Sequence, residues 1–228
     1  LFEGLEHIRA TIFCFVKCNE NHDVPVYSTN YNRWCSEGRS DLFEQVSYER
    51  VATHVFEGAI PKIGISVGNA ICKRICAYSC LREEIAPTEY VGYFHNAPQY
   101  WIRAMEFAPY FWNERNGEQI STQMKKISLR SKIDAYVVIA VLNSSLFYWW
   151  FIILSDCRHL NMREIEHFPI GLGRMRQSIK RKLIELSQHL MNDLREHSQR
   201  KACFYKTTGE VIYDEFFPRF SKPIIDEI

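Results

Sequence analysis

The stretch that decides the fold is Asn143-Ser144-Ser145-Leu146-Phe147-Tyr148-Trp149-Trp150. Residues 134–142 and 146–154 are two apolar runs that predict helices, and Asn143-Ser144-Ser145 between them supplies side chains that cap a helix N-terminus. A polar, basic loop at 156–161 follows, and the segment 165–170 then closes on Pro169. The sequence therefore predicts two apolar helices directly before a polar, basic loop.

Length and composition limit the possible classes of protein. The 228 residues are 46% hydrophobic and 14% aromatic, enough for one large domain or two small ones. A net charge of +1 is not a global basic signal, so any nucleic-acid face must come from local clustering. The longest apolar stretch has nine residues, far below a membrane span, and no signal peptide is visible. Leu1 stands where an initiator Met is expected, which predicts a fragment of a longer chain.

Eight cysteines are spread along a chain of ordinary size, which favours reduced thiols in the cytoplasm over a disulfide framework. Cys72, Cys76 and Cys80 are four residues apart and would share one helix face. We expect a buried stripe on a helix within 68–82. The alternative is metal or redox chemistry, but the spacing is not that of a zinc knuckle and a fourth ligand is missing.

The remaining pattern predicts short strands among helices. Residues 8–16 are β-branched and aromatic, a turn is expected at 19–23, and a second strand at 24–28 should pair back as a hairpin. A short amphipathic helix is expected at 38–49. Strand and turn are expected at 60–64 and a strand at 89–94, while 101–107 fits a strand or a short helix. A polar loop carries an Asn-Gly turn at 113–118, and 121–128 fits a strand or an ordered loop.

A long helix is predicted from Arg174 to Gln199, where no Gly or Pro interrupts the chain. Apolar side chains recur at three- and four-residue steps, so the helix should have one apolar face over roughly 40 Å, covered by the domain or by a partner. Its members are Ile179, Leu183, Leu186, Leu190 and Leu194. The tail 201–228 ends in what looks like the start of a further helix.

Several motifs together resemble a known family. They are Gly92-Tyr93-Phe94, Tyr100-Trp101-Ile102-Arg103, the run 142–149 and Ser221-Lys222-Pro223-Ile224-Ile225-Asp226-Glu227-Ile228. This combination resembles the target-recognition domain of adenine-specific DNA methyltransferases of type IIG restriction-modification and related phage-defence systems. The resemblance covers most of the chain and is densest over 90–170.

That resemblance implies an organisation. Residues 1–45 would connect to a missing methyltransferase domain, 46–170 would form the recognition domain, 171–200 a spacer or docking helix, and 201–228 a tail. The fold expected is α/β (α+β), with a mixed, irregular sheet, packed helices and the long amphipathic helix. Double-stranded DNA and a fused or separate methyltransferase domain are the expected partners, with no membrane and no small-molecule substrate.

Catalytic motifs are not found in the sequence. The family's methylation motif is Asn or Asp, two prolines and an aromatic that stacks on a flipped base. Asn96-Ala97-Pro98-Gln99-Tyr100 departs from it in spacing and lacks Pro-Pro, and no Gly-rich loop follows a strand. We therefore expect no cofactor in this chain, S-adenosylmethionine in the missing catalytic domain, and no methylation by the chain alone.

DNA reading needs exposed donors and acceptors, with Arg or Lys for guanine and phosphate and Asn or Gln for adenine. Two loops have this composition, and each could equally be solvated surface. Arg103 follows Trp101 and could hold a phosphate or a stacked base, while Trp101 itself is expected in the core. The first loop contains Asn113, Arg115, Asn116, Gln119, Ser121, Thr122, Gln123, Lys125 and Lys126, and the second Arg158, His159, Asn161 and Arg163.

Within these sets we expect a division of roles. The base readers would be Asn116, Gln119, Gln123, Arg158 and Asn161. The phosphate contacts would be Lys125, Lys126 and the basic start of the long helix at Arg174, Arg176, Lys180 and Arg181. The sequence thus predicts sequence-specific recognition of double-stranded DNA that positions an adenine-N6 methyltransferase. The alternative is an assembly module that docks through the helix at 174–200, favoured by a bare apolar face without a basic groove.

Overall fold

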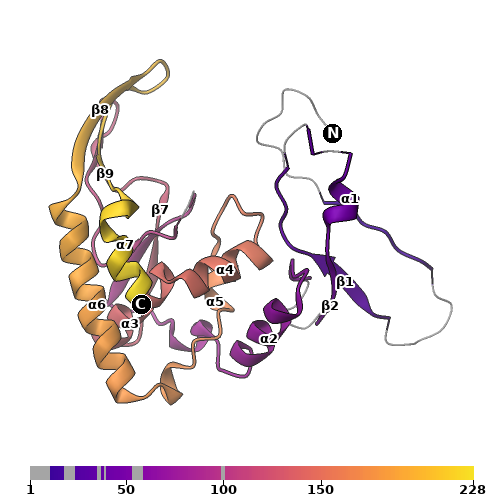
Figure 1. The fold of residues 1–228 in the computed structure, drawn as a ribbon. Helices are drawn as coiled ribbons and strands as arrows, with labels where there is room; N and C mark the ends of the chain where they lie inside the picture. Colours follow the sequence, from indigo (N-terminus) through magenta and orange to yellow (C-terminus); the bar gives the residue numbers. More distant parts are fainter. Residues whose placement is uncertain (1–10, 18–23, 35–36, 39, 53–58, 99–100) are drawn as a thin grey trace.

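The structure is a computed structural model that describes residues 11–17, 24–34, 37–38, 40–52, 59–98 and 101–228. It combines helices with three small antiparallel sheets, so the predicted mixture of helices and strands with one long helix is confirmed. The strands are divided among these sheets and do not form one mixed sheet. Figure 1 shows the N-terminal elements on one side of the molecule and the long helix on the other.

The first sheet pairs β1 (Val26–Thr29) with β2 (Tyr48–Val51). The predicted partner of the strand at 24–28 is therefore wrong: residues 11–17 have no regular secondary structure, and residues 8–10 and 18–23 lie outside the described residues. The pairing places Val26 beside Val51, and Val51 is buried. The helix expected at 38–49 is reduced to α1 (Leu42–Gln45), which buries no side chain that could stabilise a longer helix.

Helix α2 (Ser66–Ile75) carries part of the cysteine series. The Cys72 and Cys76 sulfurs lie 3.9 Å apart, as expected for positions i and i+4. Cys72 is buried, but Cys76 is exposed and Cys80 lies beyond the helix end, so the expected buried stripe is limited to Cys72. Hydrogen bonding from Cys76 lowers the pKa of Cys72, and the same contact together with burial raises the pKa of Cys76.

The two predicted apolar helices are confirmed as α3 (Lys132–Asn143) and α4 (Ser145–Leu154). The Ser144 hydroxyl accepts a hydrogen bond from the Phe147 backbone at 3.2 Å, which is the N-cap predicted between the two runs. Phe147 and Trp150 are fully buried in the main core. Among the described residues no single helix is long and apolar enough to cross a membrane, and α3 and α4 meet the criteria of length and composition only together, with a bend of 67° between them.

The second sheet has the order β4-β3-β7, with β3 (Val91–His95) in the centre, β4 (Ala104–Met105) and β7 (Met124–Ser128). Asn143 at the end of α3 attaches this sheet to the helices: its side-chain amide donates to the Ala104 carbonyl at 2.9 Å and its amide oxygen accepts from the Ala104 backbone at 3.3 Å. Gly92 of β3 faces Ile139, where an added Cβ would come within 3.2 Å of that side chain.

The long helix is α6 (Gln177–Glu196), which packs against α3 and against α7 (Pro218–Glu227). Its expected apolar face is covered within the chain itself: Leu183, Leu186, Leu190 and Leu194 are buried, and Ile179 is half exposed. The helix ends three residues before the predicted limit, and Ser198 caps it by donating to the Arg195 carbonyl at 3.0 Å.

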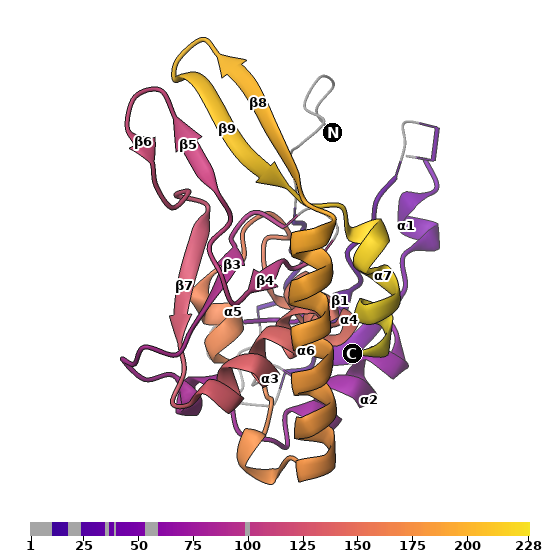
Figure 2. The ribbon, with the colours of Figure 1, turned by 90° about the vertical axis from the view of Figure 1, so that its left-hand side faces the viewer.

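The third sheet has the order β6-β5-β9-β8 and joins distant parts of the chain. Sequence analysis did not predict the hairpin of β8 (Gln199–Tyr205) and β9 (Gly209–Glu215), which begins where the long helix ends. β9 pairs with β5 (Phe111–Asn113), and β5 pairs with β6 (Gly117–Glu118) across the predicted Asn-Gly turn. Figure 2 shows both hairpins extending from the same end of the molecule, so the tail is part of the sheet that carries residues 111–118.

Candidate nucleic-acid interface

A groove of about 830 Å³ lies between the third sheet and the ends of β3 and β7. His95 and Gln123 contribute from the β3–β7 side, Arg103 from the start of β4, and Tyr205 and Asp214 from the β8–β9 hairpin. The lining is mixed, with aromatic, hydroxyl and amide groups next to one arginine. We call this cavity the groove.

Arg103 is the central charge of the groove. Its side chain is half-buried, and its buried Nε atom has no hydrogen-bond partner. Its guanidinium lies 5.0 Å from the ring centre of Phe216, the residue after β9. Burial lowers the pKa of Arg103 to about 10, so the side chain remains a cation at neutral pH. A half-buried guanidinium that no carboxylate of the described residues neutralises is suited to binding an anion.

The carboxylates that line the groove are paired with other cations. Asp214 accepts from Arg200 at 2.6 Å, and Glu215 forms an ion pair with Lys201 on the neighbouring strand β8. Within the described part of the chain, no ion pair joins either of them to Arg103. The groove therefore keeps one uncompensated positive charge.

His95 lies beside that charge. Its Nε2 atom is 2.8 Å from Oε1 of Gln123 on β7. Burial and the charge of Arg103 lower the pKa of His95, while hydrogen bonds with Gln123 and the Ala97 backbone oppose this shift. The ring is thus neutral at neutral pH and poised to gain a proton if negative charge enters the groove.

The first predicted loop is divided by the structure. The side chains of Asn113, Ser121, Thr122 and Gln123 line the groove with Arg103. The Asn113 oxygen also closes the turn by accepting from the Asn116 backbone at 2.8 Å. Three other exposed residues of this predicted loop do not line the groove. They are Arg115, Asn116 and Gln119.

Lys125 and Lys126 are both exposed, but they are neighbours on β7 and so point to opposite faces of the sheet. Lys126 pairs with Tyr93 and lies on the face of His95 and Met124, while Lys125 pairs with the buried Phe94. Lys125 and Lys126, both predicted as phosphate contacts, therefore lie on opposite faces of the sheet, and Lys126 is on the same face as His95.

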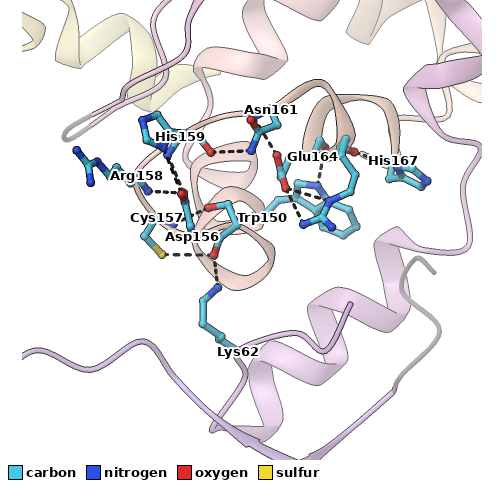
Figure 3. A network of polar contacts seen from close by, with 11 residues as sticks. Lys62, Trp150, Asp156, Cys157, Arg158, His159, Asn161, Glu164 and His167 are labelled. Atoms are coloured by element: carbon cyan, nitrogen blue, oxygen red, sulfur yellow. Dashed lines mark hydrogen bonds and ion pairs between the residues drawn. The ribbon is translucent and has the colours of Figure 1, made fainter. Parts of the chain in front are cut away.

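The second predicted loop is organised by Asp156 (Figure 3). Its Oδ1 atom accepts from the backbone of Arg158 and of His159, each at 2.7 Å, and its Oδ2 lies 3.3 Å from the His159 ring. Burial acts to raise the pKa of Asp156, but the hydrogen bonds from His159 and Arg158 outweigh it and lower that pKa. The loop thus presents the Arg158 and His159 side chains to solvent from a fixed backbone.

Asn161 and Arg163 belong to helix α5 (Met162–Glu166), which sequence analysis did not predict. Buried Glu164 accepts from the Asn161 backbone at 2.9 Å and pairs with Arg163 at 3.2 Å, and the Trp150 indole donates to the Glu164 carbonyl at 2.9 Å. Figure 3 shows that Lys62 reaches the same loop from another segment, where its Nζ donates to the Ser155 carbonyl at 2.5 Å. Asn161 and Arg163 therefore contribute to the structure of the helix start.

Two backbone hydrogen bonds connect the second loop to the groove wall. The Leu160 N–H donates to the Asn96 carbonyl at 2.8 Å, and the Asn96 N–H donates to the Gln123 carbonyl at 2.9 Å. The loop at 156–161 is thus a neighbour of the segment that carries His95 and Gln123. The structure brings the two predicted loops together through Asn96.

The basic cluster before and at the start of α6 is placed elsewhere. α6 runs from this cluster to the start of β8, a length of roughly 30 Å for its 20 residues. Figures 1 and 2 show the start of α6 at the end of the molecule opposite the hairpins. The groove is therefore remote from Arg174, Arg176, Lys180 and Arg181.

Tyr205, Thr207, Thr208 and Tyr213 line the groove but were missed by sequence analysis. A signal was present: Thr207-Thr208-Gly209 separates two runs of strand-forming residues, and Gly209 has a positive φ of 71°. Trp101 also lines the groove, and it packs against a second cluster of buried residues that includes Leu190 and Phe216.

Comparisons with known proteins add no relative: no family model, no curated protein and no solved structure matches the chain. Among the described residues, no group of three or more His, Cys, Asp or Glu side chains could hold a metal ion.

Proposed function

We propose that this chain recognises double-stranded DNA in a sequence-specific way and positions an adenine-N6 methyltransferase on its site. The observation that carries the proposal is the half-buried cation Arg103 in a groove that it shares with Gln123, Ser121 and Thr122. A phosphate supplies the anion that such a guanidinium lacks, and the amide and hydroxyl groups beside it are of the kinds that contact base edges.

The third sheet supports the same function. β-Strands are among the elements that contact DNA grooves, and the β8–β9 hairpin forms the edge of this four-stranded sheet and projects from the body of the molecule. Its tip carries the exposed Tyr205, Lys206 and Thr207, and the β5–β6 turn carries the exposed Arg115 and Asn116 at the same end. A duplex that lies across the turns of these two paired hairpins would lie beside the groove.

The methyltransferase part of the proposal rests on the family resemblance of the motifs in the sequence. S-adenosylmethionine and the methyl transfer belong to another domain, fused or separate, so this chain by itself would not methylate DNA. A cytoplasmic location is part of the proposal and agrees with the cysteines, since Cys14, Cys72, Cys76, Cys80, Cys157 and Cys203 are free thiols.

The alternative of an assembly module depends on a bare apolar helix face. Leu186, Leu190 and Leu194 are buried against α3 and α7, so this face is occupied within the chain. No observation along these leucines favours docking over DNA recognition.

The test is selection of bound duplexes from a random pool, followed by binding measurements on the selected and a scrambled duplex. Gln123→Ala should weaken binding to the selected duplex by about 1–3 kcal/mol and reduce the preference over the scrambled one, because a base contact is lost. Gln119→Ala is the matched control, since Gln119 is exposed outside the groove.

If the wild-type chain enriches no sequence and binds no duplex at low salt, the proposed function is wrong. If it enriches a sequence but Gln123→Ala and Gln119→Ala retain the same preference, the chain reads DNA through residues outside the groove.

A further inference from the structure

We propose that Arg103 and His95 form a binding site for one phosphate group of the DNA backbone, and that occupation of this site is coupled to uptake of a proton by His95. The inference rests on the proposed DNA-binding function, and it names the ligand chemistry of the groove and a pH dependence. It separates Arg103, as a phosphate contact, from the neighbouring side chains that would read bases.

The donor is preorganised for an anion. The Nε atom of Arg103 is buried and has no partner, while the 5.0 Å contact with the Phe216 ring restricts the plane of the guanidinium. A planar guanidinium binds phosphate oxygens through parallel N–H donors, a geometry that a lysine lacks. Ser121 and Thr122 line the same groove and can supply hydroxyl donors to the remaining oxygens.

The carboxylates near Arg103 are paired with other cations, so an external anion can bind to its guanidinium. Asp214 and Glu215 line the groove but are engaged by Arg200 and Lys201 from β8. Arg195 offers a useful contrast: it lies 4.2 Å from the Phe107 ring centre, and Glu106 neutralises it at 2.8 Å. Arg103 has the same kind of aromatic contact without such a carboxylate.

The pKa of His95 depends on the charged and polar groups around its ring. The charge of Arg103 disfavours the protonated form of the His95 ring, whereas hydrogen bonds with Gln123 and the Ala97 backbone favour it. Lys126 lies on the same face of the sheet as His95. Asp214 and Glu215 also line the groove, and each is held in an ion pair. A bound anion offsets the Arg103 charge and stabilises the imidazolium, so the pKa of His95 rises on binding. By linkage, anion affinity increases as the pH falls through the titration range of His95.

The first experiment measures binding of inorganic phosphate to the whole chain at constant pH and ionic strength. Arg103→Gln should reduce the affinity at least about tenfold, the loss expected for one hydrogen bond between charged groups. Arg195→Gln is the matched control and should retain the affinity. On duplex DNA, Arg103→Gln should weaken selected and scrambled sequences alike and lower the slope of log K against log salt by about 0.9.

The second experiment follows the His95 ring by NMR in the wild-type chain, so it does not depend on a variant that folds. Sulfate is the probe across pH, because its charge stays constant in this range. Saturating sulfate should raise the pKa of His95 relative to chloride at the same ionic strength, and sulfate affinity should fall with rising pH. His95→Gln should remove this pH dependence and leave binding at high pH intact.

Equal phosphate affinity in Arg103→Gln and wild type, or a His95 pKa that sulfate does not change, would overturn the inference. These failures are distinguishable from failure of the proposed function. Sequence-specific DNA binding with an unchanged salt slope in Arg103→Gln refutes the phosphate site alone, while phosphate binding without DNA binding refutes the proposed function alone.

Discussion

Glu114 and Glu210 are joined by two hydrogen bonds that connect the hairpins beside the groove. The Glu114 backbone N–H donates to the Glu210 carbonyl at 2.9 Å, and the Glu210 N–H donates to the Glu114 carboxylate at 3.0 Å. The relationship places a side chain of the β5–β6 turn against the start of β9. Residues nearly a hundred positions apart thus fix the wall of the groove.

Gly209 makes that contact possible, and its replacement provides the first prediction for stability. Gly209 and Gly117 have nearly equal positive φ values of 71° and 73°, so alanine at either position should cost about 1–2 kcal/mol of backbone strain. A Cβ at Gly209 would also collide with the Glu114 carboxylate, whereas nothing lies within 4 Å at Gly117. Urea denaturation should show a larger loss for Gly209→Ala than for Gly117→Ala. Equal losses would mean that the Glu114 contact contributes nothing.

The packing of α6 provides the second prediction. Leu190 is fully buried among α3 and α7, so Leu190→Ala should lower the free energy of unfolding by about 2–5 kcal/mol. Ile179 on the same helix is 39% exposed, and Ile179→Ala should change it by about 0.5 kcal/mol or less. Denaturant titration of both variants checks this. A small effect at Leu190 would show that α6 does not pack on the body in solution.

Lys62 provides a prediction for pH dependence. Burial lowers its pKa below the ordinary value of 10.5, with partial opposition from Cys157, Asp156 and Glu164. Between the folded and the ordinary pKa the unfolded chain binds more protons, so stability from this group increases as the pH rises toward 10.5. Lys62→Met should remove that part of the slope, while Lys206→Met, at an exposed position, should retain it. Denaturation at several alkaline pH values checks the difference; parallel curves for Lys62→Met and wild type would contradict it.

Sequence reasoning succeeded where the signal is local. The apolar runs of α3 and α4, the Ser144 cap and the leucines of α6 depend on periodicity and on neighbouring residues, and all three are confirmed. The Asn-Gly turn is likewise found between β5 and β6. Such features need no knowledge of the rest of the chain.

The candidate site depends on contacts between distant segments, which periodicity cannot predict. The pairing of β5 with β9 buries Arg103 beside Phe216, and neither residue alone indicates that arrangement. The basic start of α6 was grouped with the DNA-binding residues because of its charge, but a rigid helix separates it from the groove. Strand alternation also divides Lys125 from Lys126, although they are adjacent in sequence.

The pairing of β5 with β9 has a consequence for how the molecule forms during synthesis. β5 leaves the ribosome long before β9, because strands β6, β7 and β8 and helices α3 to α6 lie between them in the chain. During synthesis the N-terminal part of a chain is made first, and each domain generally folds as a unit. Arg103 therefore lacks its Phe216 contact until β9 and the residue after it have been made. A nascent chain that ends before β9 would lack one wall of the groove, so the anion site proposed above could form only late in translation.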